Sequence, residues 1–189
     1  MAAGMSVQAT VIEKEARRKA EVVGVNVILR LLCLITTVTA LSLMVTAKQD
    51  STISVFGLSL PVQSKWSFSD SFQYVVGVTA AVAFHSFVQL LYNIPMILRK
   101  SPVISSRNYL WLLFAVDQLL AYALMSAGSA ASGVTNLNRT GIHHSALPNF
   151  CKPLSHFCNR VAVSIGFTFL SWLLLAAATV ADVVWLSKH

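Results

Sequence analysis

Charged residues are scarce in this chain of 189 residues, of which only 11% are Asp, Glu, Lys or Arg. Soluble domains carry roughly a quarter of their residues in charged form. The deficit excludes an ordinary soluble domain, and it is a poor match to an enzyme with a polar cleft or to a disordered scaffold. Only three cysteines are present, which is too few for a zinc-finger array.

Apolar residues dominate instead: 56% of the chain is hydrophobic, and the mean hydropathy is +0.67. A membrane-spanning helix needs about 20 apolar residues. Four runs meet that length, near residues 22–46, 72–97, 108–132 and 160–186. The sequence therefore predicts an all-α membrane protein with an N-terminal tail, a membrane domain and a short C-terminal end, at 1–21, 22–186 and 187–189.

The distribution of Lys and Arg predicts the orientation in the membrane. The tail before the first run has four basic residues and the 99–107 connection has three, whereas the 48–71 and 133–159 segments have two each. Basic residues are enriched on the cytoplasmic side, so we expect both termini in the cytoplasm and an up-down-up-down four-helix bundle. Because the basic residues flank apolar runs, the net charge of +7 does not indicate nucleic acid as a partner.

Two interpretations of the N-terminal tail remain open. Glu13 with Arg17, and Glu15 with Lys19, are i,i+4 pairs in the favourable order, which stabilises a helix. They favour a first helix that begins before the membrane, and a disordered tail is the alternative.

Two full charges, Arg30 and Asp117, lie well inside predicted spans. Both are eight or nine residues from the cytoplasmic side, which at 1.5 Å per residue places them roughly 12–14 Å deep. Equal depth on two helices of the same direction predicts a buried ion pair, because an unpaired charge there is costly. A proton or ion relay and a snorkelling Arg30 are the alternatives. Asp182, in the last turns of the fourth span, is expected to snorkel to the interface.

The second span carries a polar stripe of His85, Gln89 and Asn93 at successive i,i+4 positions, so one helix face is polar. Interhelical hydrogen bonds are the first interpretation. The alternative function, a small transporter or channel, would use this stripe together with Arg30 and Asp117. The sequence lacks the midspan Gly and Pro breaks that many transporters have at their binding sites.

Small residues gather in the third span at 127–133 and recur in the fourth at Ala162 and Gly166. Such faces permit close helix packing. The sequence leaves open whether they pack within one bundle or between copies.

The outer segments carry three further candidates. Cys151 and Cys158 lie seven residues apart on the oxidising side, where nearby cysteines usually pair, so we predict a disulfide. A zinc site with the neighbouring histidines 143, 144 and 156 matches no compact structural pattern. Asn138 begins an N-glycosylation triplet in a segment predicted to be outside. The first outer segment alternates polar and apolar residues around a Gly, which predicts two short strands.

No nucleophile with its base, no phosphate-binding glycine loop and no paired carboxylates are evident in the sequence. We therefore expect neither catalysis nor a cofactor, and no metal.

As a set, these features resemble the Casparian strip membrane domain protein-like (CASP-like) family of plants. The features are the four spans, Arg30, Asp117, the sequence Ser-Asp-Ser-Phe-Gln-Tyr-Val-Val at 69–76, and Cys151 followed by Phe157-Cys158. The resemblance implies a MARVEL-related plasma-membrane protein that forms homo- and hetero-oligomers with other CASP-like proteins. It also implies a membrane scaffold with extracellular wall-modifying enzymes as partners, because the founding members build platforms that direct lignin deposition. By position, Arg30 with Asp117 and Cys151 with Cys158 match the family's intramembrane pair and second-loop cysteines.

The first outer segment departs from the founding members of that family. They have an acidic residue, Ser-Leu-Pro and then a Phe pair. Here Ser59, Leu60 and Pro61 are kept and are the candidates for partner recognition, but Leu58 replaces the acid and Val62-Gln63 replaces the aromatics. The resemblance therefore predicts a CASP-like relative rather than a founding member.

Overall fold

The computed structural model describes residues 2–55, 58–99, 107–141 and 151–186. Four of its helices are long and apolar enough to cross a membrane, which confirms the predicted four-helix membrane fold. The elements in chain order are α1 (Ala2–Val45), β1 (Lys48–Val55), β2 (Leu58–Lys65), the short 3₁₀ helix η1 (Trp66–Phe68), α2 (Asp70–Arg99), α3 (Arg107–Thr140) and α4 (Ser155–Leu186).

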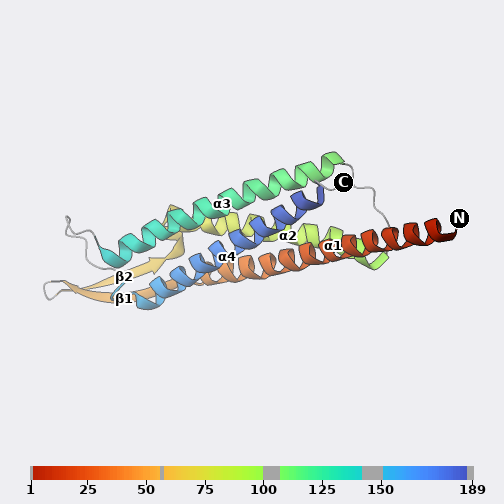
Figure 1. The fold of residues 1–189 in the computed structure, drawn as a ribbon. Helices are drawn as coiled ribbons and strands as arrows, with labels where there is room; N and C mark the ends of the chain where they lie inside the picture. Colours follow the sequence, from red (N-terminus) through yellow and green to blue (C-terminus); the bar gives the residue numbers. More distant parts are fainter. Residues whose placement is uncertain (1, 56–57, 100–106, 142–150, 187–189) are drawn as a thin grey trace.

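The four helices run up and down in one elongated bundle (Figure 1). α1 packs on α2 and α4, and α3 packs on the same two helices, so α1 and α3 face each other across the diagonal. The core has two apolar layers. The outer layer, next to the strands, is built around Met44, Phe72 and Phe157, and the middle layer is built around Leu124 and Leu175.

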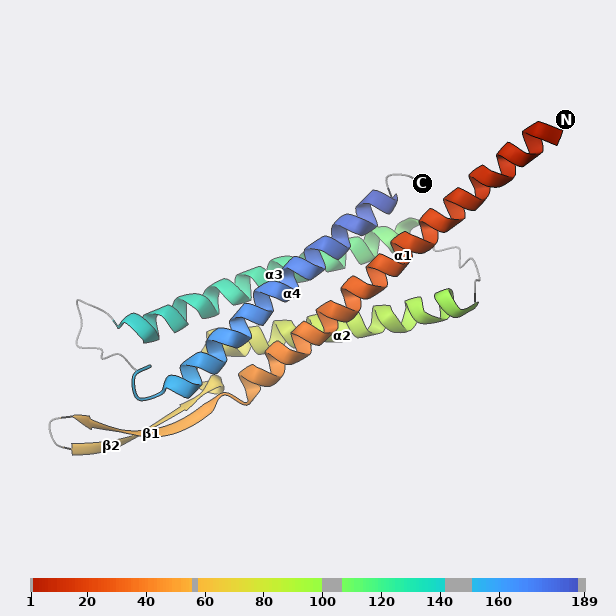
Figure 2. The same cartoon turned by 60° about the horizontal axis from the view of Figure 1, so that its bottom comes forward.

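Helices α1 and α3 are longer than their apolar runs. α1 is continuous from Ala2 and projects beyond the other helices at its N-terminal end (Figure 2). α3 continues past residue 132 to Thr140. It ends at Gly141, whose φ of 68° and bond from its N–H to the Leu137 carbonyl form a left-handed helix cap. Hydropathy marks where a helix leaves the hydrocarbon, whereas the cap marks where the helix ends.

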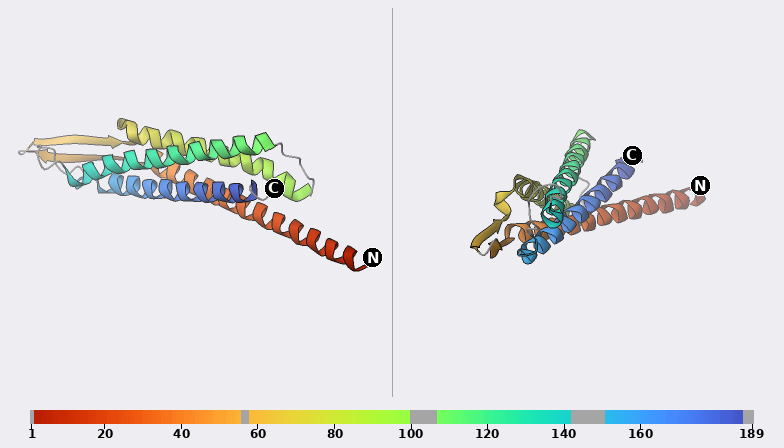
Figure 3. Two further views of the ribbon diagram at one scale, coloured as in Figure 1. Left: turned by 45° about the horizontal axis from the view of Figure 1, so that its top comes forward. Right: turned by 90° about the vertical axis from the view of Figure 1, so that its left-hand side faces the viewer.

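The first outer segment forms an antiparallel hairpin, as its alternation predicts. The register runs from Lys48 opposite Lys65 to Val55 opposite Leu58. A bond from the Trp66 N–H to the Ala47 carbonyl closes its base. The hairpin continues beyond the outer end of the bundle, roughly along the bundle axis (Figures 1 and 3).

Candidate functional site

The most buried charges of the bundle are Arg30 on α1 and Asp117 on α3, at 2% and 0% exposure. Their side chains meet across the diagonal between the two helices. Nη1 of Arg30 donates to Oδ1 of Asp117 at 3.2 Å, and Nη2 donates to Oδ2 at 2.5 Å. This bidentate geometry is the strongest form of an arginine–carboxylate pair. The structure thus brings together the two charges for which the sequence predicts equal depth.

Arg30 also binds a second carboxylate. Its Nη2 lies 3.1 Å from Oδ2 of Asp182 on α4, and its Nε donates to the Asn26 side-chain oxygen at 3.0 Å. The Asn26 amide donates in turn to Asp182. Asp182, which the sequence predicts to snorkel to the interface, is thus also held by two side chains of α1.

The direction of helical side chains explains why Arg30 reaches Asp182. Side chains on a helix lean toward its N-terminus, and the C-terminal end of α4 lies alongside α1 short of the N-terminal part that projects (Figure 2). A long side chain from Arg30 therefore extends toward the end of the bundle at which Asp182 sits. The i,i+4 spacing of Asn26 and Arg30 is a sequence signal for the contact between those two side chains, whereas the contact with Asp182 depends on how α1 and α4 pack.

Helix α2 supplies two further polar groups to Asp117. Nε2 of His85 lies 2.8 Å from Oδ1 of Asp117. Because an ionised carboxylate only accepts, His85 donates its Nε2 hydrogen there. The Gln89 Nε2 donates to the same carboxylate oxygen, Oδ1 of Asp117, at 3.4 Å. It also lies 2.6 Å from His85 Nε2, but with the hydrogen of His85 directed at Asp117 that contact joins two donors and is not a hydrogen bond. Two members of the predicted stripe thus point at Asp117, and the side chain of the third, Asn93, lies outside the described residues.

These contacts define one group that all four helices build, called here the four-helix polar cluster. Its members are Asn26, Arg30, His85, Gln89, Asp117 and Asp182. A buried charge that loses its partner is strongly destabilising, so the cluster fixes the rotation of each helix in the bundle. Within the part of the stripe that the structure describes, His85 and Gln89 each have Asp117 as a partner.

The contact between α1 and α4 also depends on small polar side chains. The Ser164 hydroxyl donates to the Ala40 carbonyl at 2.7 Å, and the Ser171 hydroxyl donates to Thr36 Oγ1 at 2.8 Å. These residues are buried. Small hydroxyl residues allow close approach of two helices and give each buried polar atom a partner.

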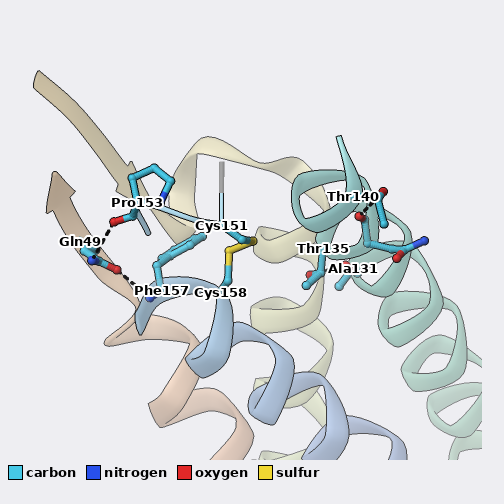
Figure 4. The surroundings of a disulfide bond; sticks show 9 residues. Gln49, Ala131, Thr135, Thr140, Cys151, Pro153, Phe157 and Cys158 are labelled. Atoms are coloured by element: carbon cyan, nitrogen blue, oxygen red, sulfur yellow. Dashed lines mark hydrogen bonds between the residues drawn. A yellow bond between two sulfur atoms is a disulfide. The ribbon is translucent and has the colours of Figure 1, made fainter. Parts of the chain in front are cut away.

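A disulfide joins Cys151, which precedes α4, to Cys158 in the first turn of α4, with Cα atoms 5.8 Å apart (Figure 4). Gln49 of β1 binds the same turn. Its Oε1 accepts from the Phe157 N–H at 2.9 Å, and its Nε2 donates to the Pro153 carbonyl at 3.5 Å. The side chain satisfies an N-terminal N–H of α4 that has no partner inside the helix. The hairpin base and the disulfide therefore form one joined outer end.

Of the other sequence candidates at this end of the bundle, Asn138 lies next to the disulfide, because its backbone carbonyl accepts from the Cys151 N–H at 3.4 Å. Asn138 falls in the last turn of α3 rather than in a loop. Pro61 is exposed on β2, and the side chains of Ser59 and Leu60 lie outside the described residues. Residues 143 and 144 also lie outside them, and within the described part no group of three metal-ligating side chains is found.

The small residues of α3 and α4 divide between two faces. Ala127, Gly128 and Ala131 are buried, and a Cβ at Gly128 would come within 3.2 Å of the Phe169 ring on α4. That part of the stripe packs inside the bundle. The exposed part consists of Ser129, Ala130 and Gly133 on α3 and of Ala162 and Gly166 on α4. A Cβ at either exposed glycine would meet open space, so close packing within one chain does not require them.

Comparison with known proteins gives consistent results. A family model described as the Casparian strip membrane protein domain matches residues 19–174. The CASP-like protein 3A1 of Ricinus communis is 66% identical over 177 residues, which cover 94% of this chain and 82% of that protein. The CASP-like protein 3A2 of Populus trichocarpa is 67% identical over 171 residues, 90% of this chain and 80% of that protein. The CASP-like protein 3A1 of Oryza sativa subsp. japonica is 51% identical over 164 residues, which cover 87% of this chain and 80% of that protein. No solved structure matches.

Proposed function

The chain belongs to the Casparian strip membrane protein domain family, and from that premise we propose that it is a plasma-membrane scaffold. Copies associate with one another and with other members of the family, and the assembly organises a subdomain of the membrane. The observation that carries the proposal is the match itself, since the family model covers residues 19–174.

The interior of the bundle supports a scaffold. In the four-helix polar cluster the charged and amide side chains bind one another, and their contacts connect all four helices. Groups held in this way resist rotation of single helices, because each rotation would expose a charge to lipid. A bundle of this kind suits a fixed building block.

The outer faces of the helices support association within the membrane. Gly133 and Gly166 are exposed with open space around their Cα atoms, and exposed small neighbours extend both stripes. Helices in lipid approach closely through such faces. These faces give a second copy, or another family member, a surface on which to pack.

The outer end supports recognition of partners outside the cell. The hairpin projects beyond the helices (Figure 3), and the disulfide and Gln49 fix its base to α4. Loops held on a rigid frame are common sites of recognition. We assign the binding of wall-modifying enzymes to this end of the molecule.

Transport through the bundle is not supported by a specific observation. His85 and Gln89, which a pathway would need, both contact Asp117. Purified protein in vesicles is expected to leave a proton gradient intact.

Co-isolation of two differently tagged copies from plasma membranes tests the proposal. We expect each tag to recover the other, and Gly166→Leu to lower the recovered fraction by filling the exposed face. Val180→Leu, on an exposed position of the same helix, is the matched control and should leave recovery unchanged. Copies that never co-isolate, even after cross-linking in the intact membrane, would contradict the scaffold.

A further inference from the structure

Among the residues that the structure describes, no further strand pairs with either edge of the hairpin, and the structure shows which backbone groups face those edges. The Trp66 N–H donates to the Ala47 carbonyl, so this pair is a hydrogen-bonded pair. Such pairs alternate along an antiparallel ladder, and the register makes Lys48–Lys65 the next, non-bonded pair. Residues of the non-bonded pairs direct their N–H and C=O groups away from the hairpin. On β1 these are Lys48, Asp50, Thr52 and Ser54, and on β2 they are Ser59, Pro61, Gln63 and Lys65.

An edge of this kind favours a further strand. A two-stranded ribbon is only marginally stable in water, and its outward N–H and C=O groups are a template for pairing. The contacts that the structure describes between strand β1 and α4 lie at the hairpin base, where Gln49 meets the start of α4. The rest of the hairpin continues beyond the helix ends (Figures 1 and 2). Asp50, Thr52, Pro61 and Gln63 are all exposed there.

We propose that the β1 edge of one copy pairs with the β2 edge of a second copy of this chain, so that neighbouring hairpins form one antiparallel sheet outside the membrane. The inference rests on the proposed function, because it requires copies that associate in one membrane.

The shared membrane selects which edges meet. Copies in one bilayer stand in the same orientation, and the hairpin runs roughly along the bundle axis (Figure 3). Two β1 strands side by side would then run in the same direction, whereas β1 beside β2 of the next copy is antiparallel. Antiparallel pairing is the more stable arrangement per residue. The contact is therefore heterologous, with a different edge contributed by each copy.

Charge selects the register of that contact. Within one hairpin Lys48 lies opposite Lys65, and like charges in that position are unfavourable. A register with Asp50 opposite Lys65 of the second copy gives this lysine an opposite charge. It offsets neighbouring hairpins by two residues, about 7 Å along the strand, which requires strands that tilt from the membrane normal as in a closing sheet. The same register places Thr52 opposite Gln63 and Ser54 opposite Pro61 of the second copy. Pro61 lacks an N–H, so the contact loses a single donor there and the ladder ends.

Geometry limits the size of the assembly. Two strands occupy roughly 10 Å of sheet width, whereas a bundle two helices wide occupies roughly 20 Å. Copies joined by their hairpins therefore cannot stand in a straight row, and the bundles must fan out around the hairpins. Heterologous contacts that turn by a fixed angle close into a ring when the successive rotations complete a circle.

Disulfide trapping between two differently tagged variants, each with one added cysteine, tests the pairing. Thr52→Cys and Gln63→Cys would face each other with Cα atoms about 5.5 Å apart, within disulfide range. We expect a mixed-tag dimer in oxidising membranes. Gln63→Cys in both tagged copies is the matched control and should give little mixed dimer, because the pairing does not bring two β2 edges together. A Thr52→Cys protein that only dimerises with itself, or a mixed dimer no more abundant than the control, would overturn the proposal.

Substitutions at the edge test it independently of cysteine chemistry. Thr52→Pro removes an outward N–H and keeps the hairpin's own ladder, so we expect several-fold less oligomer, whereas Thr52→Val should behave as the parent chain. Asp50→Lys should also lower the oligomer, and adding Lys65→Asp to the same chain should restore it. An oligomer unaffected by Thr52→Pro and by Asp50→Lys would refute edge pairing and leave the scaffold intact. A parent chain that stays monomeric in the membrane would refute both.

Discussion

Replacing Asp117 by Asn should destabilise the bundle more than the same change at Asp182, although both carboxylates bind Arg30. The substitution keeps the shape of the side chain and removes its charge, so no cavity is formed. Arg30, whose side chain is 3% exposed, would retain only Asp182 as a charged partner. His85 would lose the carboxylate to which it donates. The free energy of unfolding therefore falls, because the buried Arg30 guanidinium keeps one carboxylate partner instead of two.

The two substitutions should differ in size. Removing one partner of a buried ion pair costs roughly 3–5 kcal/mol, and the remaining contact with Asp182 places Asp117→Asn near the lower end, at about 3 kcal/mol. At this chain length that lowers Tm by roughly 6–12 °C. The Asp182 side chain is 29% exposed, so Asp182→Asn should cost about 1 kcal/mol or less.

Thermal unfolding of the purified variants in one detergent measures this difference, and delivery to the plasma membrane gives a second readout. Replacing both Arg30 and Asp117 by Leu should be less harmful than the sum of the two single changes, because no unpaired charge of that pair remains. Equal Tm values for Asp117→Asn and Asp182→Asn, or a normal Tm for Asp117→Asn, would refute the central place of Asp117 in the cluster.

Three further outcomes are expected. Cys151→Ser should lower stability by about 2–3 kcal/mol by the chain-entropy account of short loops, and hydrogen exchange should show loss of protection confined to the start of α4. Gly128→Leu should lower Tm, because even a Cβ at this position would lie 3.2 Å from the Phe169 ring and a longer side chain would collide with it, whereas Gly133→Leu should leave Tm unchanged. Gln49→Ala should cost about 1–2 kcal/mol through its two lost bonds, measured as a lower Tm with the disulfide still formed.

Much of the fold follows from patterns that depend on one physical cause. The lengths of the apolar runs indicate four spans, because hydrocarbon thickness sets a minimum length. Equal depth brings Arg30 and Asp117 together, because an unpaired charge in lipid is costly. The alternation in the first outer segment predicts the two strands, because side chains alternate across a strand.

Other features are contacts between helices, and the residue pattern of one helix does not predict them. His85 forms an i,i+4 stripe with Gln89 on α2, but its contact with Asp117 requires the relative rotation of α2 and α3. Asp182 lies near a helix end, where snorkelling is the simplest expectation, and its contact with Arg30 depends on the lean of that side chain toward the same end. The end of α3 is set by Gly141 rather than by hydropathy.

Fluorescence recovery of the tagged chain in the plasma membrane of living cells tests the scaffold most directly. We expect slow and incomplete recovery, with faster recovery for the Thr52→Pro and Gly166→Leu variants at equal surface levels. Recovery as fast and complete as that of a monomeric four-span protein of similar size would contradict it.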